Sequence, residues 1–228
     1  MNVRLLSNEA ETPTTRRIRV GLDGATFTYR AGQAASLSAG GGVATPYSIA
    51  SSPRETERHG WLEFLVKVDR SNRFGAAIQH LAPGAAIDLI GPMGAFTLER
   101  VPAHVPLLFI AGGTGIAPMR SMIREALDSD WSGGLSLVYS SRRPGEFAYL
   151  NELRDLAEAG QLHLTLTLTG DAEDWAHARG RTAPGHFAEL LQPATVAFVC
   201  GPRAMVTDVP AALVALGLAR DRVVTEDW

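Results

Sequence analysis

Short apolar runs separated by turn residues characterise the chain up to about residue 100. The runs with the patterning of strands are RRIRVGL, ATFTYRA, TPYSIAS, WLEFLVKV and AAIDLIG. Glycine and proline fall between them, as they do between the strands of all-β domains. We therefore expect a small antiparallel barrel, interrupted by one helical segment near residues 75–81.

A different rhythm follows from residue 107. Apolar runs alternate with helical stretches: the runs are PLLFIA, LSLVYS, LHLTLTL, TVAFVC and RVVT, and the helical stretches lie near 117–128, 147–159, 184–192 and 203–217. Such alternation predicts an α/β doubly wound parallel sheet, here of five strands. Because the stretch ERVPAHVP at 99–106 carries two prolines and precedes this change, we expect two domains, 1–100 and 101–228.

A glycine-rich turn joins a strand to a helix in PLLFIAGGTGIAP. Gly112, Gly113 and Gly115 let the backbone turn tightly and approach a ligand, and the N-terminus of the helix favours a phosphate. Pro118 stands in place of the third glycine of GxGxxG, so this is not the usual dinucleotide fingerprint, and a simple packing turn is the alternative. A second turn of small residues, starting at Cys200, is expected at the same edge of the sheet, although Cys200 could equally be a small buried residue.

Composition and charge narrow the chemistry. The chain has 46% hydrophobic and 20% charged residues and a net charge of -3, with neither a basic stripe for nucleic acid nor a polybasic membrane patch. No apolar stretch approaches the roughly 20 residues of a membrane span, and the N-terminus lacks the apolar region of a signal peptide, so we expect a cytoplasmic protein. The single cysteine excludes an internal disulfide and an iron–sulfur cluster held by four thiolates of this chain. The six histidines form no zinc motif, so we expect no metal site and assign any redox chemistry to an organic cofactor.

The segment GGGVATPYSIASSP at 40–53 departs from the pattern of an ordinary buried strand. Tyr47 and Ser48 stand side by side, and hydroxyl groups return at Ser51 and Ser52 before Pro53. Either this strand faces a ligand or it carries ordinary surface serines.

TPYSIASSP, AGGTGIAP, VCGPRAM and the terminal EDW occur in this order along nearly the whole chain. The set resembles the ferredoxin–NADP reductase superfamily of flavoenzymes. The resemblance implies an antiparallel Greek-key β-barrel that binds FAD, followed by a doubly wound domain that binds NADH or NADPH. It also implies an oxidoreductase in which hydride passes from the nicotinamide to the flavin.

The resemblance assigns the flavin to residues of the first half. Tyr47 would pack against the isoalloxazine and ribityl region, and Ser48 would donate a hydrogen bond near flavin N5. The full set of expected flavin-binding residues is Thr45, Pro46, Tyr47 and Ser48, then the strand backbone at Val66, Lys67 and Val68, and then Arg73, Phe74, Gly75 and Ala76.

Two positions depart from the family pattern. Thr45 occupies the place of the Arg of an ArgxTyrSer motif that pairs with the flavin phosphates; Arg73, and after it Lys67, are the candidates to replace that charge. The segment NRFG at 72–75 lies where the family has a GxxS pyrophosphate cradle, but Asn72 and Gly75 differ at its ends. The backbone N–H groups of Phe74, Gly75 and Ala76 could still bind phosphate at the start of a helix. GPMGAF at 91–96 resembles the loop that ends the flavin barrel, and a structural role is favoured for it.

The resemblance places the nicotinamide cofactor in the second half. Its pyrophosphate would lie on Gly112, Gly113, Thr114 and Gly115, and its nicotinamide beside Cys200 and the turn of Gly201, Pro202 and Met205. Ser48, Cys200 and Glu226 match positions that line the hydride-transfer site and are the catalytic candidates. Trp228 resembles the terminal aromatic residue that covers the flavin.

The choice between NADH and NADPH depends on charge beyond the inner strands. Gly170 replaces an Arg that is common in NADPH-selective relatives, and Asp171 and Glu173 would repel a 2′-phosphate, which favours NADH. Against this, Ser141 and Arg142 could bind that phosphate, as could Arg179 or Arg181.

Electrons accepted by the flavin must leave the chain, and the expected partner is a separate ferredoxin, oxygenase component or similar carrier. The alternatives are a flavin reductase that uses free flavin as a diffusible substrate, and a non-catalytic module that kept the fold. The presence of Ser48, Cys200 and Glu226 together disfavours the last.

Overall fold

The computed structural model describes residues 1–68 and 73–227. It divides into two compact units. The first contains Met1–Glu99 and Arg120–Asp128, and the second contains Arg100–Met119 and the chain from Ser129 onward. Most of helix α3 (Ile116–Leu127) is therefore counted with the first unit.

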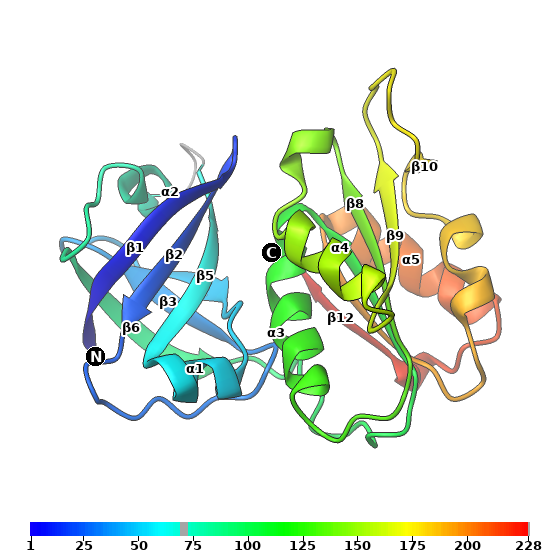
Figure 1. Ribbon diagram of the computed structural model, residues 1–228, viewed down its shortest axis with the longest axis horizontal. Helices are drawn as coiled ribbons and strands as arrows, with labels where there is room; N and C mark the ends of the chain where they lie inside the picture. The colour runs from blue at the N-terminus through cyan, green and yellow to red at the C-terminus, as the bar shows by residue number, and fades with distance from the viewer. Residues whose placement is uncertain (69–72, 228) are drawn as a thin grey trace. The chain divides into compact units, whose positions relative to one another are not determined.

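The first unit is an antiparallel barrel (Figure 1). Its described residues form six strands in the order β4-β3-β6-β1-β2-β5. They are β1 (Asn2–Thr12), β2 (Thr15–Gly21), β3 (Ala34–Ser38), β4 (Thr45–Ser48), β5 (Trp61–Lys67) and β6 (Ala86–Met93). An antiparallel bridge from Ile49 to Phe64 joins the two edges of this sheet. The predicted barrel is confirmed.

Two of the barrel strands were not predicted, and one predicted strand is wrong. The sequence of β1 buries only Val3, Leu5 and Thr12, and β3 is built from alanine, serine and one leucine, so neither has the apolar alternation of a typical strand. ATFTYRA, 25–31, has that alternation but lies in a loop. There the Tyr29 side chain is buried and donates a hydrogen bond to the Ser51 carbonyl (2.9 Å).

Helix α1 (Pro53–His59) was also not predicted, although its start is encoded in SSPRE. The Ser52 hydroxyl accepts a hydrogen bond from the Glu55 N–H (3.1 Å), and the Glu55 carboxylate accepts one from the Ser52 N–H (2.8 Å). This reciprocal capping box, together with Pro53 in the first turn, begins the helix. The predicted helix at 75–81 is present as α2 (Arg73–Ile78), which begins two residues earlier and ends three residues earlier than predicted.

The second unit is a parallel sheet covered by helices. Within residues 100–227 its six strands have the order β10-β9-β8-β7-β11-β12, and neighbouring strands are parallel. They are β7 (Leu107–Gly112), β8 (Leu135–Ser141), β9 (His163–Leu168), β10 (Ala178–Arg179), β11 (Val196–Gly201) and β12 (Val223–Asp227). All five predicted strands are present, and the two-residue β10 adds a sixth.

Helices α4 (Leu150–Glu158) and α5 (Arg203–Ala215) lie on opposite faces of this sheet (Figure 1). The helix predicted at 184–192 is instead two short 3₁₀ turns, Pro184–His186 and Ala188–Leu190. Phe187, whose φ of -141° is not helical, separates the two turns, and Pro193 follows them. No helix in the described part of the chain is both long and apolar enough to cross a bilayer.

Candidate functional site

Strand β4, the first strand in the order of the barrel sheet, carries Thr45, Pro46, Tyr47 and Ser48, which are predicted to bind the flavin. Its register with β3 pairs Ser48 with Ala34 and Tyr47 with Ala35. Tyr47 and Ser48 are 9% and 7% exposed, whereas Pro46 is exposed and Thr45 half-buried. The strand therefore has one largely buried end, Tyr47-Ser48, and one accessible end.

The Tyr47 ring contacts the start of α2. It lies 5.6 Å from the Phe74 ring, with the two planes tilted by 51°. The first turn of a helix has N–H groups that face no carbonyl of the same helix. The aromatic side chain of Tyr47 thus lies beside the start of α2. These two segments are the ones predicted to contact the ring and the phosphates of the same flavin nucleotide. Asn72 and Trp228 lie outside the described residues.

The residues at the end of β5 that are predicted to contact the flavin differ in their exposure. The Val66 side chain is fully buried in the barrel core, while Lys67 is exposed. The Val68 N–H donates to the Thr14 carbonyl (2.9 Å), so this group is already part of the barrel. Gly75 is buried, Ala76 half-buried and Arg73 exposed.

The hydroxyl groups after Ser48 have a structural role instead. Ser51 Oγ accepts a hydrogen bond from the Glu63 N–H (3.1 Å) and lies 3.2 Å from the Tyr29 hydroxyl. Ser121 Oγ donates to the Ser51 carbonyl (2.7 Å). The polar run at 47–52 thus divides into Tyr47 and Ser48, which are site candidates, and Ser51 and Ser52, which tie the strand end to its neighbours.

A buried ion pair holds the same turn. Arg120 is 6% exposed; its Nη1 donates to the Ala50 carbonyl (2.8 Å), and both terminal nitrogens donate to the Glu55 carboxylate (3.0 Å each). Burial alone would raise the pKa of Glu55, but the Arg120 guanidinium outweighs it, so this pKa lies below its ordinary value of 4.5. Sequence reasoning missed Arg120 and Ser121; their signal is a pair of polar residues in the otherwise apolar first part of a helix, IAPMRSMI.

In the second unit, the glycine loop combines tight packing with open space. A Cβ added at Gly115 would collide with the Cys200 carbonyl oxygen, and one at Gly112 would lie 2.7 Å from Pro202 Cδ. A Cβ at Gly113, whose φ is +56°, would meet no heavy atom within 4 Å. Thr114 and Gly115 complete a 3₁₀ turn (Gly113–Gly115) that leads directly into α3.

The turn after β11 packs against this loop. A Cβ at Gly201 would lie 2.8 Å from Met205 Sδ and 3.1 Å from the backbone of Gly112. Cys200 is fully buried, and it pairs in register with Ala111 on one side and Glu226 on the other. The structure thus brings together most of the residues predicted for the nicotinamide cofactor: Gly112, Gly113, Thr114, Gly115, Cys200, Gly201, Pro202, Met205 and Glu226.

The residues predicted to choose between NADH and NADPH follow β8 and β9. Ser141 is buried, and its carbonyl accepts a hydrogen bond from the Thr169 N–H (2.9 Å). A Cβ at Gly170 would collide with the Arg142 carbonyl oxygen, while the Arg142 side chain is exposed. Gly170 is therefore required by a close approach of two backbone segments.

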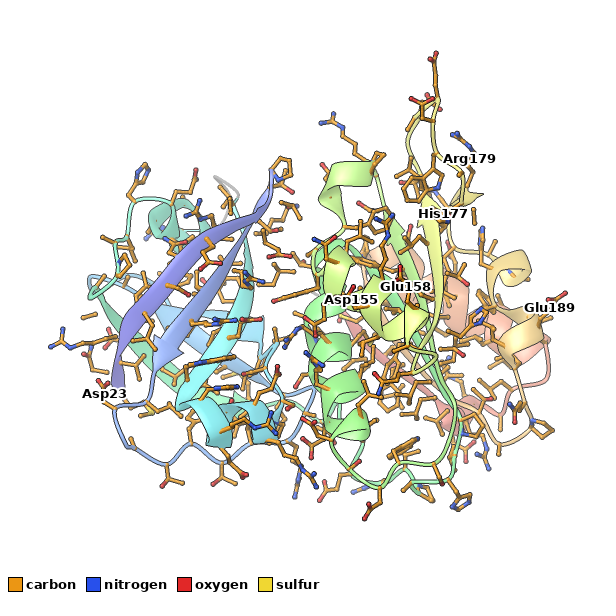
Figure 2. The ribbon with its side chains drawn as sticks, in the orientation of Figure 1. Asp23, Asp155, Glu158, His177, Arg179 and Glu189 are labelled. Atoms are coloured by element: carbon orange, nitrogen blue, oxygen red, sulfur yellow. The ribbon has the colours of Figure 1, made fainter. Side chains whose placement is uncertain are left out.

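The segment between β9 and β10 extends past the end of the sheet and carries His177, and Arg179 follows in β10 (Figures 1 and 2). Arg179 Nη2 donates to the carbonyls of Ala172 (2.6 Å) and Trp175 (3.3 Å). This guanidinium thus binds its own loop, whereas Arg181 is exposed.

These features fit the two cofactors. A pyrophosphate needs backbone N–H groups next to unfilled space, which Gly113 and the start of α3 provide at the carboxyl edge of the sheet. The flavin site offers an aromatic side chain beside a helix start. Within residues 1–68 and 73–227, no group of three or more His, Cys, Asp or Glu side chains could hold a metal ion.

Comparison with known proteins finds one family match in each half of the chain. Residues 2–98 match the family described as "Oxidoreductase FAD-binding domain", and residues 109–210 match "Oxidoreductase NAD-binding domain". Ferredoxin–NADP reductase B of Sorangium cellulosum is 33% identical over 219 residues, which cover 90% of this chain and 88% of that protein. The chain belongs to the ferredoxin–NADP reductase superfamily of flavoprotein oxidoreductases.

Two further relatives widen this picture. The ferredoxin–NAD(P)(+) reductase component of the naphthalene 1,2-dioxygenase system of Pseudomonas putida is 30% identical over 219 residues, 94% of this chain and 65% of that protein. The crystal structure of a ferredoxin NADP+ reductase from Neisseria gonorrhoeae with bound FAD and NADP has the same fold. Its TM-score is 0.87 at 21% identity, covering 100% of this chain and 98% of that one.

Proposed function

We propose that this chain oxidises NADH or NADPH through bound FAD and passes the electrons to a separate acceptor protein, a ferredoxin or an oxygenase component. The observation that carries the proposal is the presence, in one chain, of the Tyr47–Phe74 pair in the barrel and the glycine loop packed on Cys200 and Gly201 in the parallel sheet. The relatives' roles as reductases of ferredoxins and of an oxygenase system support the acceptor class.

The residues divide the work as follows. Bound FAD supplies a ring that accepts two electrons from a dihydronicotinamide and releases them one at a time. Ser48 would donate a hydrogen bond to the flavin ring, and Tyr47 would pack on it. The loop at Gly112–Gly115 would bind the nicotinamide cofactor's pyrophosphate, with Cys200 and Glu226 bordering its nicotinamide. The protein's contribution is orientation of the two rings and exclusion of water.

Cofactor content tests the proposal first. The purified protein should be yellow, and acid extraction followed by mass determination should give one FAD per chain. Adding NADH or NADPH without oxygen should bleach the bound flavin, and a ferredoxin or cytochrome c should then be reduced. Colourless protein that reduces added free flavin would favour the diffusible-substrate alternative, and extraction of FMN alone would overturn the FAD assignment.

A matched pair of serine variants tests the role of Ser48. Ser48→Ala should slow reduction of the bound flavin about tenfold, because one hydrogen bond to the ring is lost. Ser36→Ala is the control, since Ser36 lies on the neighbouring strand β3 opposite Pro46. Equal rates in the two variants would remove Ser48 from the site.

A further inference from the structure

The hydroxyl of Tyr139 bridges two loops at the carboxyl edge of the parallel sheet. Tyr139 lies on β8 and is fully buried. Its hydroxyl donates to the carbonyl oxygen of Gly113 (3.1 Å) and accepts a hydrogen bond from the Ala148 N–H (3.2 Å). A single oxygen atom thus connects the glycine loop after β7 to the segment that precedes α4.

Aromatic contacts extend this bridge to a third segment. The Tyr139 ring meets the Phe147 ring edge to face, with centroids 5.0 Å apart and planes at 85°. Phe147 stacks on Trp175 at 5.4 Å and 5°, and Trp175 Nε1 donates to the Ala178 carbonyl (2.8 Å). Trp175 belongs to the long segment between β9 and β10 that also carries His177 (Figure 2). Side chains from β8, from the segment before α4 and from the segment after β9 therefore pack in one row that ends on Gly113.

The bond to Gly113 fixes the direction of a donor. Gly113 has φ +56°, and its carbonyl also accepts a hydrogen bond from the Ile116 N–H. Because a trans peptide is planar, the Gly113 carbonyl and the Thr114 N–H point in opposite directions. Holding the carbonyl on Tyr139 consequently holds the Thr114 N–H on the other side of the same peptide.

The hydroxyl is not needed to fill the core. Phenylalanine would occupy the same space without a polar atom to satisfy, and a buried phenol is tolerated because its oxygen is hydrogen-bonded. The choice of tyrosine at this place is explained by the orientation that it gives to the loop.

We propose that Tyr139 is a positioning residue for the nicotinamide cofactor: it orients the Gly113–Thr114 peptide so that the Thr114 N–H binds the pyrophosphate, and the row of Phe147 and Trp175 keeps the phenol in place. This inference rests on the proposed function of the glycine loop and adds a residue that sequence reasoning missed. Its signal in the sequence is a large aromatic residue that precedes two serines at the end of a buried inner strand, LSLVYSS.

The test compares two electron donors on the FAD-saturated protein. NADH carries the pyrophosphate, whereas 1-benzyl-1,4-dihydronicotinamide has the reducing ring and no phosphate. Tyr139→Phe should raise the KM for NADH about fivefold to tenfold, as expected for one hydrogen bond, with kcat little changed. The rate with the benzyl compound should stay the same.

Tyr29→Phe is the matched control. Tyr29 is also buried, and its hydroxyl is bonded to the Ser51 carbonyl and lies 2.8 Å from Thr56 Oγ1, but it belongs to the barrel. The Tyr29→Phe variant should have a lower unfolding temperature and an unchanged KM for NADH. If Tyr139→Phe does not fold, Phe147→Leu takes its place as the test, because it keeps the phenol and removes the ring that packs against it. The KM for NADH should again rise, and the rate with the benzyl compound should stay the same.

An unchanged KM in the folded Tyr139 or Phe147 variant, or an equal loss with both donors, would overturn the positioning role. The proposed function fails in a different way. In that case the unaltered protein would be reduced by the benzyl compound and by neither NADH nor NADPH, and the role of Tyr139 would fall with it.

Discussion

Cys200 and Glu226 occupy paired positions on the neighbouring parallel strands β11 and β12. Paired residues of adjacent strands have their side chains on the same face of the sheet. The thiol is fully buried, the carboxyl side chain is half-buried, and both strands end within two residues of this pair. A small polarisable group and an acid are therefore neighbours at the edge where the glycine loop lies.

Replacing either member should affect chemistry more than flavin binding. We expect Cys200→Ala and Glu226→Gln to slow reduction of the bound flavin at least tenfold in stopped-flow experiments, and to change the FAD dissociation constant less than twofold. Thr225→Val is the control, because Thr225 is exposed and pairs with Val199, one register position away. Unchanged reduction rates in both variants would exclude the pair from the site.

NADH should be preferred over NADPH. We expect Asp171 and Glu173 to repel a 2′-phosphate, and Arg179, in the adjoining β10, donates to the Ala172 and Trp175 carbonyls. Steady-state kcat/KM values measure the preference, and Asp171→Asn combined with Glu173→Gln should narrow it. A tenfold preference for NADPH, about 1.4 kcal/mol, contradicts this prediction.

The charge missing at Thr45 should be measurable as flavin affinity. A charge-assisted bond to phosphate contributes roughly 1.5–3 kcal/mol, so Thr45→Arg should tighten FAD about tenfold to a hundredfold. Arg73→Ala should loosen it, whereas Arg58→Ala, an exposed position on α1, should not. Titration of the apoprotein with FAD gives the dissociation constants. If Thr45→Arg and Arg73→Ala both leave the constant unchanged, the proposed exchange of phosphate partners is wrong.

Breaking the Arg120–Glu55 pair should destabilise the first unit. Arg120→Met leaves a buried carboxylate, which costs about 3–5 kcal/mol, and adding Glu55→Gln should recover part of the loss. Because the folded pKa of Glu55 lies below 4.5, the pair stabilises above that pH and its contribution is lost as pH falls through the lowered pKa. The free energy of unfolding should be measured for the FAD-bound unaltered protein and the FAD-bound Arg120→Met variant, at pH 7 and in acid. The difference between the two proteins should be smaller in acid. A constant difference would show that the charge is not responsible.

The glycines of the loop should separate into two kinds. Gly115→Ala should prevent folding of the second unit, since its Cβ meets the Cys200 carbonyl. Gly113→Ala should fold, at a cost of about 1–2 kcal/mol for its left-handed φ, and raise the KM for NADH because the methyl group enters the open space. Circular dichroism and steady-state kinetics distinguish the two. A well-folded Gly115→Ala protein would contradict the packing described.

Local signals account for what the sequence could predict. Neighbouring residues encode the apolar strands β7, β8, β9 and β11 and the turn at Gly112–Gly115. The position of this turn at the carboxyl edge of the sheet follows from the same local pattern. The capping box of Ser52 and Glu55 was equally local and would have identified α1.

Other features depend on distant partners. β1 forms because β2 and β6 pair with it on both sides, which its own polar residues do not reveal. ATFTYRA has the composition of a strand, but Tyr29 is committed to Ser51 and Thr56, so the segment stays a loop. The bridge from Tyr139 to Gly113 spans 26 residues and follows only from the parallel register of β7 and β8.

The close approach of Gly170 to the Arg142 carbonyl limits how cofactor choice can evolve in this chain. A single Gly170→Arg exchange would introduce the charge that we expect to favour a 2′-phosphate, together with a Cβ that the neighbouring backbone excludes. The benefit of the new charge would appear only after the turn at Arg142 had changed. Adaptation from one dinucleotide to the other is therefore epistatic here, and libraries that vary both turns together should yield switched enzymes that single-site saturation at position 170 misses.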